Sequence, residues 1–153
     1  MKAIYTVENY IPEKGVGHLL GRARAGVLAA IDRELAKDPE LSALELSSAQ
    51  FLALNGIELG VADTTTRLCE KMTYDPGAMT RMVDRLEAKG LIQRRRCTQD
   101  RRQVYLELTD AGRAAMPRMF ACAVTALNGM LQGFSLDEVR QLEGFLTRMI
   151  SNV

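Results

Sequence analysis

The spacing of apolar residues changes abruptly at Gly90, and this change restricts the possible folds more than any other feature of the chain. Before Gly90, apolar side chains recur every three or four residues, which is the period of amphipathic helices. Two short runs follow, 91–96 and 103–108, and apolar and polar residues alternate in the second, as they do in strands. Helical spacing returns after Thr109. The sequence therefore predicts a mostly helical chain that contains one small β-hairpin.

Residues that cap helices mark where the predicted helices begin. The first helix spans about residues 15–37 and ends before Pro39, because proline restricts the backbone of the residue that precedes it. Gly90 ends the helix before the hairpin as a left-handed C-terminal residue. The other expected starts are capping boxes at Ser47 and Ser135, a cap at Asp63 or Thr64, the pair Asp75-Pro76, and a cap at Thr109.

Charge is distributed unevenly along a chain whose composition is otherwise that of a folded, soluble protein. The 153 residues are 47% hydrophobic and 25% charged, with a net charge of +1. Between residues 76 and 106, however, eight basic residues stand against three acidic ones, a net charge of +5. Such a stretch is typical of a protein that binds a polyanion, although a solvated basic face would have the same composition.

Helix, short turn, helix and basic hairpin follow one another in the order of a winged helix-turn-helix. In that arrangement the second helix enters the major groove of DNA with its N-terminal residues towards the base edges. Arg81 can pair bidentately with guanine, and Thr80 lies beside it. Gly77 and Ala78 leave room for a phosphate at the N–H groups that begin this helix. Arginines at the tip of the hairpin can enter the narrow minor groove.

Three blocks in this region carry a family resemblance: TRMVDRLEAKGLIQR at residues 80–94, DRR at 100–102 and LELTDAG at 106–112. With these blocks the chain resembles the MarR family of bacterial transcription regulators over roughly residues 10 to 150. The resemblance implies a mostly α fold with a small two- or three-stranded β wing. A winged helix-turn-helix domain (45–109) would then be flanked by N- and C-terminal dimerisation helices (10–40 and 110–153).

The resemblance also implies a role and a set of DNA-binding residues. Members bind an inverted-repeat operator in duplex DNA as homodimers, and most repress a nearby gene until a small phenolic or carboxylate effector releases them. Arg67 and Cys69 stand where the family usually has Glu and Ala, and Arg67 could add a phosphate contact. The implied or candidate DNA contacts are Arg67, Gly77, Ala78, Thr80, Arg81, Arg85, Arg96, Asp100, Arg101 and Arg102, with Asp100 orienting a neighbouring arginine.

A second copy of the chain is also expected from apolar side chains that a winged domain of this size cannot cover alone, including Met119, Phe120 and Phe134. For an effector, His18 and Arg22 could hold an anionic group in the cleft between the dimerisation helices and the winged domain. Phe51 and Tyr74 could line that cleft. For each residue taken singly, an ordinary packing or surface role is the more frequent alternative.

Cys97 offers a second hypothesis, because it follows three arginines and positive neighbours lower the pKa of a thiol. A regulator gated by oxidation of Cys97 is therefore the alternative to one gated by a ligand. With a single histidine, no nucleophile-plus-base constellation and no metal or cofactor site is expected, so the chain is not predicted to be an enzyme. The absence of an apolar signal or spanning segment predicts a cytoplasmic protein without a membrane partner.

Overall fold

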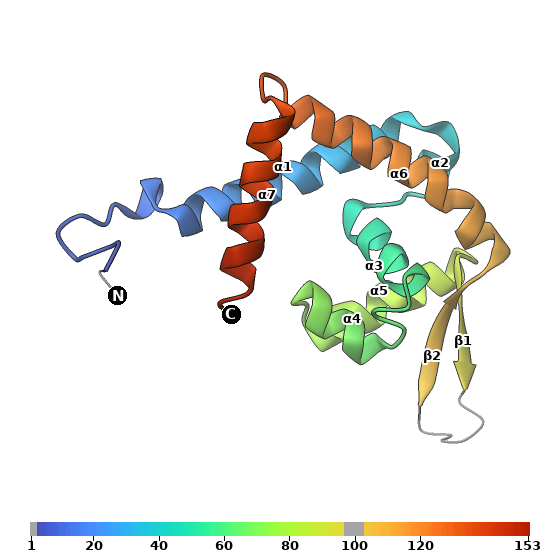
Figure 1. The fold of residues 1–153 in the computed structure, drawn as a ribbon. Coiled ribbons are helices and arrows are strands. Elements are labelled where there is room, and N and C mark those ends of the chain that lie inside the picture. Colours follow the sequence, from blue (N-terminus) through green and yellow to red (C-terminus); the bar gives the residue numbers. More distant parts are fainter. Residues whose placement is uncertain (1–2, 97–102) are drawn as a thin grey trace.

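The computed structural model describes residues 3–96 and 103–153, which form a mostly helical chain with one hairpin (Figure 1). A short 3₁₀ turn, η1 (Pro12–Lys14), precedes the first helix. The remaining elements are α1 (Val16–Lys37), α2 (Pro39–Ala43), α3 (Ser48–Glu58), α4 (Thr65–Met72), α5 (Pro76–Ala88), β1 (Ile92–Arg96), β2 (Val104–Leu108), α6 (Asp110–Met130) and α7 (Leu136–Ile150). The change of period at Gly90 therefore predicted the helix-to-hairpin transition correctly.

Helices α3, α4 and α5 and the hairpin form a winged helix-turn-helix. Their shared core consists of fully buried aliphatic side chains, among them Leu54, Leu68, Val83, Leu86 and Leu106. The two strands are antiparallel, in a register that pairs residue 92 with 108 and residue 96 with 104. In the described part of the chain the wing has two strands, and a single backbone hydrogen bond from Leu106 to the carbonyl of Asp63 (2.8 Å) ties β2 to the loop before α4.

The predicted caps are present. The Ser47 and Ser135 capping boxes form in full, and Thr64 rather than Asp63 caps α4 by accepting from the N–H of Arg67 at 3.2 Å. One helix was not predicted. Pro39 was expected only to end the first helix, but the Asp38 side chain accepts from the N–H groups of Glu40 and Leu41 and so starts α2 there.

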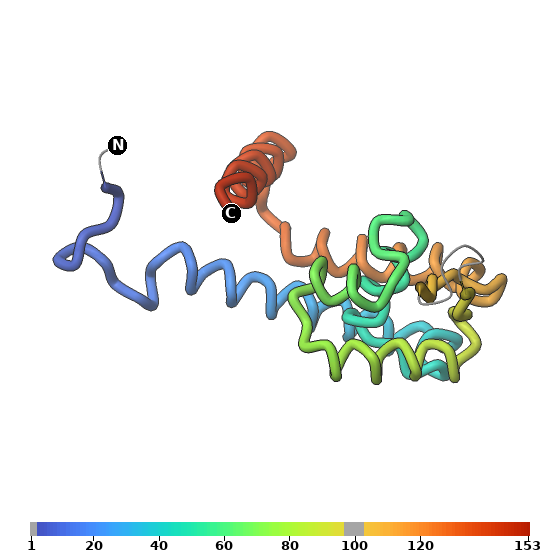
Figure 2. Tube along the Cα trace, turned by 90° about the horizontal axis from the view of Figure 1, so that it is seen from below, coloured from blue at the N-terminus to red at the C-terminus, as the bar shows by residue number. Residues whose placement is uncertain are grey.

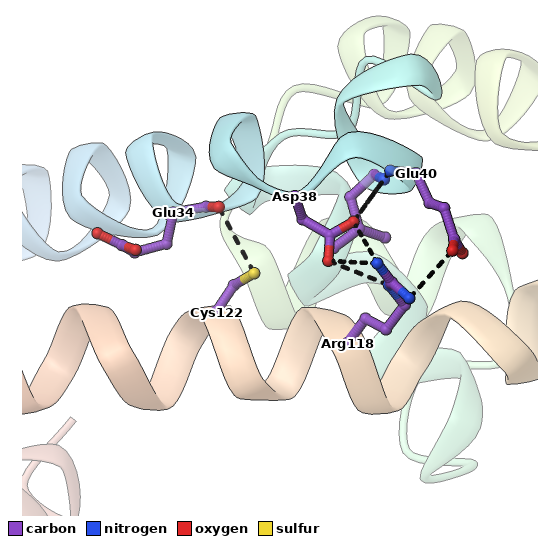
Figure 3. Close-up of polar contacts among 6 residues, drawn as sticks. Glu34, Asp38, Glu40, Arg118 and Cys122 are labelled. Carbon is purple, nitrogen blue, oxygen red and sulfur yellow. Dashed lines mark hydrogen bonds and ion pairs between the residues drawn. The ribbon is translucent and has the colours of Figure 1, made fainter.

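Asp38 also fixes α6 against the end of α1 (Figure 3). The Arg118 guanidinium donates to both oxygens of this carboxylate at 3.0 and 3.1 Å and lies 3.1 Å from Glu40. The hydrogen bond from the Leu41 N–H, with those from Arg118, lowers the pKa of Asp38. One turn along α6, the Cys122 thiol lies 3.6 Å from the Glu34 carbonyl, and burial raises its pKa.

The N-terminal half of α1 and the whole of α7 project from this body (Figures 1 and 2). Only Ala30, Ile31 and Leu35 of α1 are buried, and α7 buries no residue. The projecting elements, the C-terminal half of α6 and the loop that follows α6 expose a set of large apolar side chains: Val16, Leu19, Phe120, Val124, Leu127, Met130, Phe134, Leu136, Leu142, Phe145, Met149 and Ile150. In the described ranges, no helix combines the length and the apolar character that crossing a membrane requires.

Candidate nucleic-acid interface

Helix α5 is held in a defined rotation by its buried face. Met79, Val83 and Leu86 are completely buried, so the opposite face of the helix turns outward. That outward face carries Thr80, Arg81 and Arg85, all exposed. The hairpin extends from the same side of the molecule, away from α1 and α6 (Figure 1). The exposed residues of α5 and the hairpin therefore belong to consecutive elements of the same winged domain.

The start of α5 is less open to a phosphate than the sequence predicts. The Asp75 carboxylate accepts from the N–H of Ala78 at 2.9 Å, so this N–H is already paired, and Ala78 itself is half-buried. Gly77 is exposed, and a Cβ there would lie 3.1 Å from the Asp75 carboxylate and 3.7 Å from the Arg81 guanidinium. The hydroxyl of Thr80 donates to the Pro76 carbonyl at 2.9 Å. Of Gly77 and Ala78, which were predicted to leave room for a phosphate, Gly77 is therefore the exposed one whose N–H does not serve the Asp75 cap.

Several of the basic residues in this region are engaged by neighbouring groups of the same chain. Arg94 on β1 bridges Asp84 (2.6 Å) and Glu87 of α5, and Arg95 pairs with Glu107 across the hairpin and lies over the Tyr105 ring. The Arg94 pairs join the wing to α5, whereas the Arg95 contacts lie within the hairpin.

Lys89, at the end of α5, is held in a similar way. Its ammonium donates to the Glu45 carbonyl at 2.8 Å and to the Gln50 side chain at 3.2 Å, and burial lowers its pKa. This contact ties the end of the recognition helix to the turn before α3.

Three arginines on this surface are exposed and make no ion pair with another described residue: Arg81, Arg85 and Arg96. Arg67 on α4 is exposed but pairs with Asp63 at 2.7 Å. The four remaining predicted residues of the hairpin tip, namely Cys97, Asp100, Arg101 and Arg102, lie outside the described residues. The described interface therefore consists of the outer face of α5 and the last residue of β1.

A cavity of about 530 Å³ lies between α1, α3 and the turn that joins α4 to α5. Arg24 and Lys71 contribute positive charge to its walls. The other lining residues are Leu28, Ala49, Leu52, Asn55, Met72, Thr73 and Tyr74.

The cavity contains one of the four predicted effector residues. Tyr74 lines it, whereas His18 and Arg22 are exposed on the projecting half of α1 and do not reach it within one chain. Phe51 is buried in the core with its ring edge-on to Phe120 at 5.3 Å. Sequence reasoning missed Arg24, which precedes Leu28 by one helical turn and so shares its side of α1.

Comparison with known proteins agrees with this architecture. The model of the MarR family matches residues 46–104, which span the three helices and most of the hairpin. The multiple antibiotic resistance protein MarR of Escherichia coli K12 is 33% identical over 111 residues, covering 72% of this chain and 77% of that relative.

Solved structures share the fold over nearly the whole chain. Wild-type MarR from E. coli has a TM-score of 0.75 at 27% identity, with 92% of this chain and 98% of that chain covered. BpsR from Bordetella bronchiseptica, described by its regulation of DNA binding by 6-hydroxynicotinic acid, has a TM-score of 0.75 at 26% identity, covering 94% and 98%. The winged helix-turn-helix with its outward arginines and the similarity to these relatives lead to one conclusion: the chain belongs to the MarR family of transcription regulators.

Proposed function

We propose that this protein is a dimeric repressor of a nearby gene, which binds an inverted-repeat operator and releases it when a small phenolic or carboxylate effector binds. The observation that carries the DNA-binding part is the outward face of α5, where Arg81 and Arg85 are exposed and make no ion pair with a described residue. Guanidinium groups so placed can reach guanine edges or phosphates without first breaking an internal contact.

The DNA contacts follow from the position of each residue. Arg81 and Thr80 lie at the start of α5 and would read bases, with Arg85 one turn further along. Gly77 and Ala78 would allow the backbone to approach closely, and Arg96, Arg101 and Arg102 would enter the minor groove, with Asp100 orienting one of them. Arg67 would contact a phosphate only after leaving Asp63. Because its partner is DNA, we expect the protein in the cytoplasm.

The exposed apolar faces of α1, α6 and α7 support the dimer. Phe145 is 56% exposed and Ile150 74% exposed, and neither is surrounded by enough of its own chain to be shielded from water. Contiguous apolar surfaces of this kind mark protein interfaces. In a symmetric pair of chains each such face covers its counterpart, and the two recognition helices are then related by the two-fold axis that an inverted repeat matches.

The cavity between α1 and α3 supports a small effector with an apolar body and a negative group. Its aliphatic walls, Leu28, Leu52 and Met72, suit an aromatic ring, while Arg24 and Lys71 suit a carboxylate. BpsR, whose DNA binding is regulated by 6-hydroxynicotinic acid, provides a related precedent. The described residues contain nothing that favours gating by Cys97, and we propose no second function.

The experiment is fluorescence anisotropy of the protein on its own upstream intergenic duplex and on a scrambled duplex, at several salt concentrations, with and without salicylate. We expect tight, salt-sensitive binding to the native duplex that salicylate weakens. Specific binding that ignores salicylate would keep the DNA-binding role but reject this effector class. Equally weak binding to both duplexes would reject the proposed repressor of a nearby gene.

A further inference from the structure

Tyr74 lines two cavities. One is the 530 Å³ cavity between α1 and α3, with Arg24 and Lys71 in its walls. The other is a cavity of about 340 Å³ that Tyr74 lines together with Arg81 and Arg85 of the recognition helix. Tyr74 is half-buried and packs against the hydrophobic core. It is the one residue that lines both of these cavities in the described part of the chain.

The backbone is constrained on both sides of Tyr74. Thr73 ends α4 in the left-handed backbone conformation, with φ at +55°, which residues other than glycine and asparagine rarely adopt. Asp75 begins α5 and holds its first turn through the N–H of Ala78. Because no residue intervenes between these two constraints and Tyr74, any shift of the Tyr74 backbone also moves the end of α4 or the start of α5.

We propose that Tyr74 transmits occupancy of the cavity between α1 and α3 to Arg81 and Arg85, so that an occupant of that cavity alters how the recognition helix meets DNA. This inference rests on the proposed function and names the residue through which the effector acts. An occupant held by the basic wall residues and packed on Leu52 presses on the ring. The ring then takes space from the two arginines that line the second cavity.

A filled cavity can be made without knowing the effector. Ala49 is half-buried and lines the cavity, and Leu52, 39% exposed, lines it from its more open side. The substitution Ala49→Phe places a ring where an effector would sit. Leu52→Phe is a second occupant, better tolerated because that residue is only partly buried. Each is combined with Tyr74→Ala, which removes the ring, and with Tyr74→Phe, which keeps it.

We measure binding to the native duplex by anisotropy, and amide hydrogen exchange of residues 76–82 without DNA. We expect the filled cavity to weaken operator binding at least tenfold and to speed exchange of the Ala78 and Met79 amides. In the Tyr74→Ala background the same filling should change binding less than twofold, and in the Tyr74→Phe background the full tenfold should return. Thermal unfolding checks that each variant is folded.

The outcomes distinguish a failure of the role of Tyr74 from a failure of the proposed function. Equal weakening by a filled cavity in the Tyr74→Ala and unsubstituted proteins, or no change in binding and exchange on filling by either ring, would overturn the role of Tyr74 while leaving specific DNA binding intact. Loss of all preference for the native duplex in the unsubstituted protein would overturn the proposed function. In that case the exchange rates at residues 76–82 still decide whether Tyr74 couples the cavity to α5.

Discussion

Replacing Arg94 by glutamine distinguishes a basic residue that orients the wing from basic residues that meet DNA. The Arg94 guanidinium lies 2.6 Å from Asp84 and also pairs with Glu87, and its side chain is 33% exposed. Both carboxylates belong to α5, whereas Arg94 belongs to β1. The pair therefore joins the recognition helix to the wing, and its charge is neutralised within the protein.

The expected magnitudes follow from this geometry. A partly exposed ion pair contributes roughly 0.2–1 kcal/mol, so losing two should cost about 1 kcal/mol of stability per protomer. A wing that is less well oriented and two carboxylates left near DNA should weaken operator binding about fivefold, roughly 1 kcal/mol. Each lost phosphate contact lowers the slope of log K against log salt by about 0.9, or about 1.8 for the two copies in a dimer. For Arg94→Gln we expect almost no change in this slope.

Arg96→Gln is the matched control, because Arg96 lies two residues further along β1 and pairs with no described carboxylate. It should lower the slope by about 1.8 if both copies contact phosphate. The assay is anisotropy on the native duplex between about 50 and 200 mM salt, the range over which phosphate contacts dominate the salt dependence. A slope for Arg94→Gln that falls as far as that for Arg96→Gln would refute the positioning role and make Arg94 a direct phosphate contact.

Three further predictions concern the fold and the interface. In Gly112→Ala the new Cβ would overlap the Leu91 carbonyl, so denaturant unfolding should show that the free energy of unfolding falls by at least about 2 kcal/mol. The control Gly144→Ala, on the open polar side of α7, should be neutral or stabilising by up to about 1 kcal/mol. Because the pKa of Asp38 is lowered in the folded protein, its ionised carboxylate stabilises the fold above the usual carboxyl pKa of about 4. This stabilisation is lost as the pH falls through the lower folded value, so the difference in stability between the protein and Asp38→Asn should disappear in acid. Arg81→Ala should reduce discrimination between native and scrambled duplex by roughly 1–3 kcal/mol, measured by anisotropy, and unchanged discrimination would remove Arg81 from base reading.

Local signals in the sequence were sufficient for most of the fold. Caps and apolar periods act within one or two turns, and Ser47, Asp75, Thr109 and Ser135 all do what such signals predict. The missed helix α2 shows the limit of the interpretation. The pair Asp38-Pro39 carries the same helix-start signal as Asp75-Pro76. Proline also ends helices, and the prediction at Pro39 rested on that property alone.

The interface was less predictable because it depends on contacts between distant segments. Arg94 and Arg96 are both arginines of one short strand, and only the packing of β1 beside α5 decides that the first is paired with Asp84. The walls of the cavity come from α1, α3 and the α4–α5 turn, so a residue such as Arg24 is recognised only after those elements meet. Tyr74 and Phe51 were both expected to line the cleft, and of the two only Tyr74 lines the cavity, whereas Phe51 is buried in the core.

The distribution of charge indicates how this protein would find a specific site. Residues 76–106 carry a net charge of +5, whereas the whole chain has only +1, so the remainder is net negative. Attraction to DNA should then be strongest at the segment of residues 76–106, which favours encounters that begin there. Within that segment Arg94 and Arg95 are already paired with carboxylates, which lowers the non-specific attraction further. Binding strength should therefore depend on correctly placed groups such as Arg81, and a displacement of α5 is expected to weaken binding to the operator.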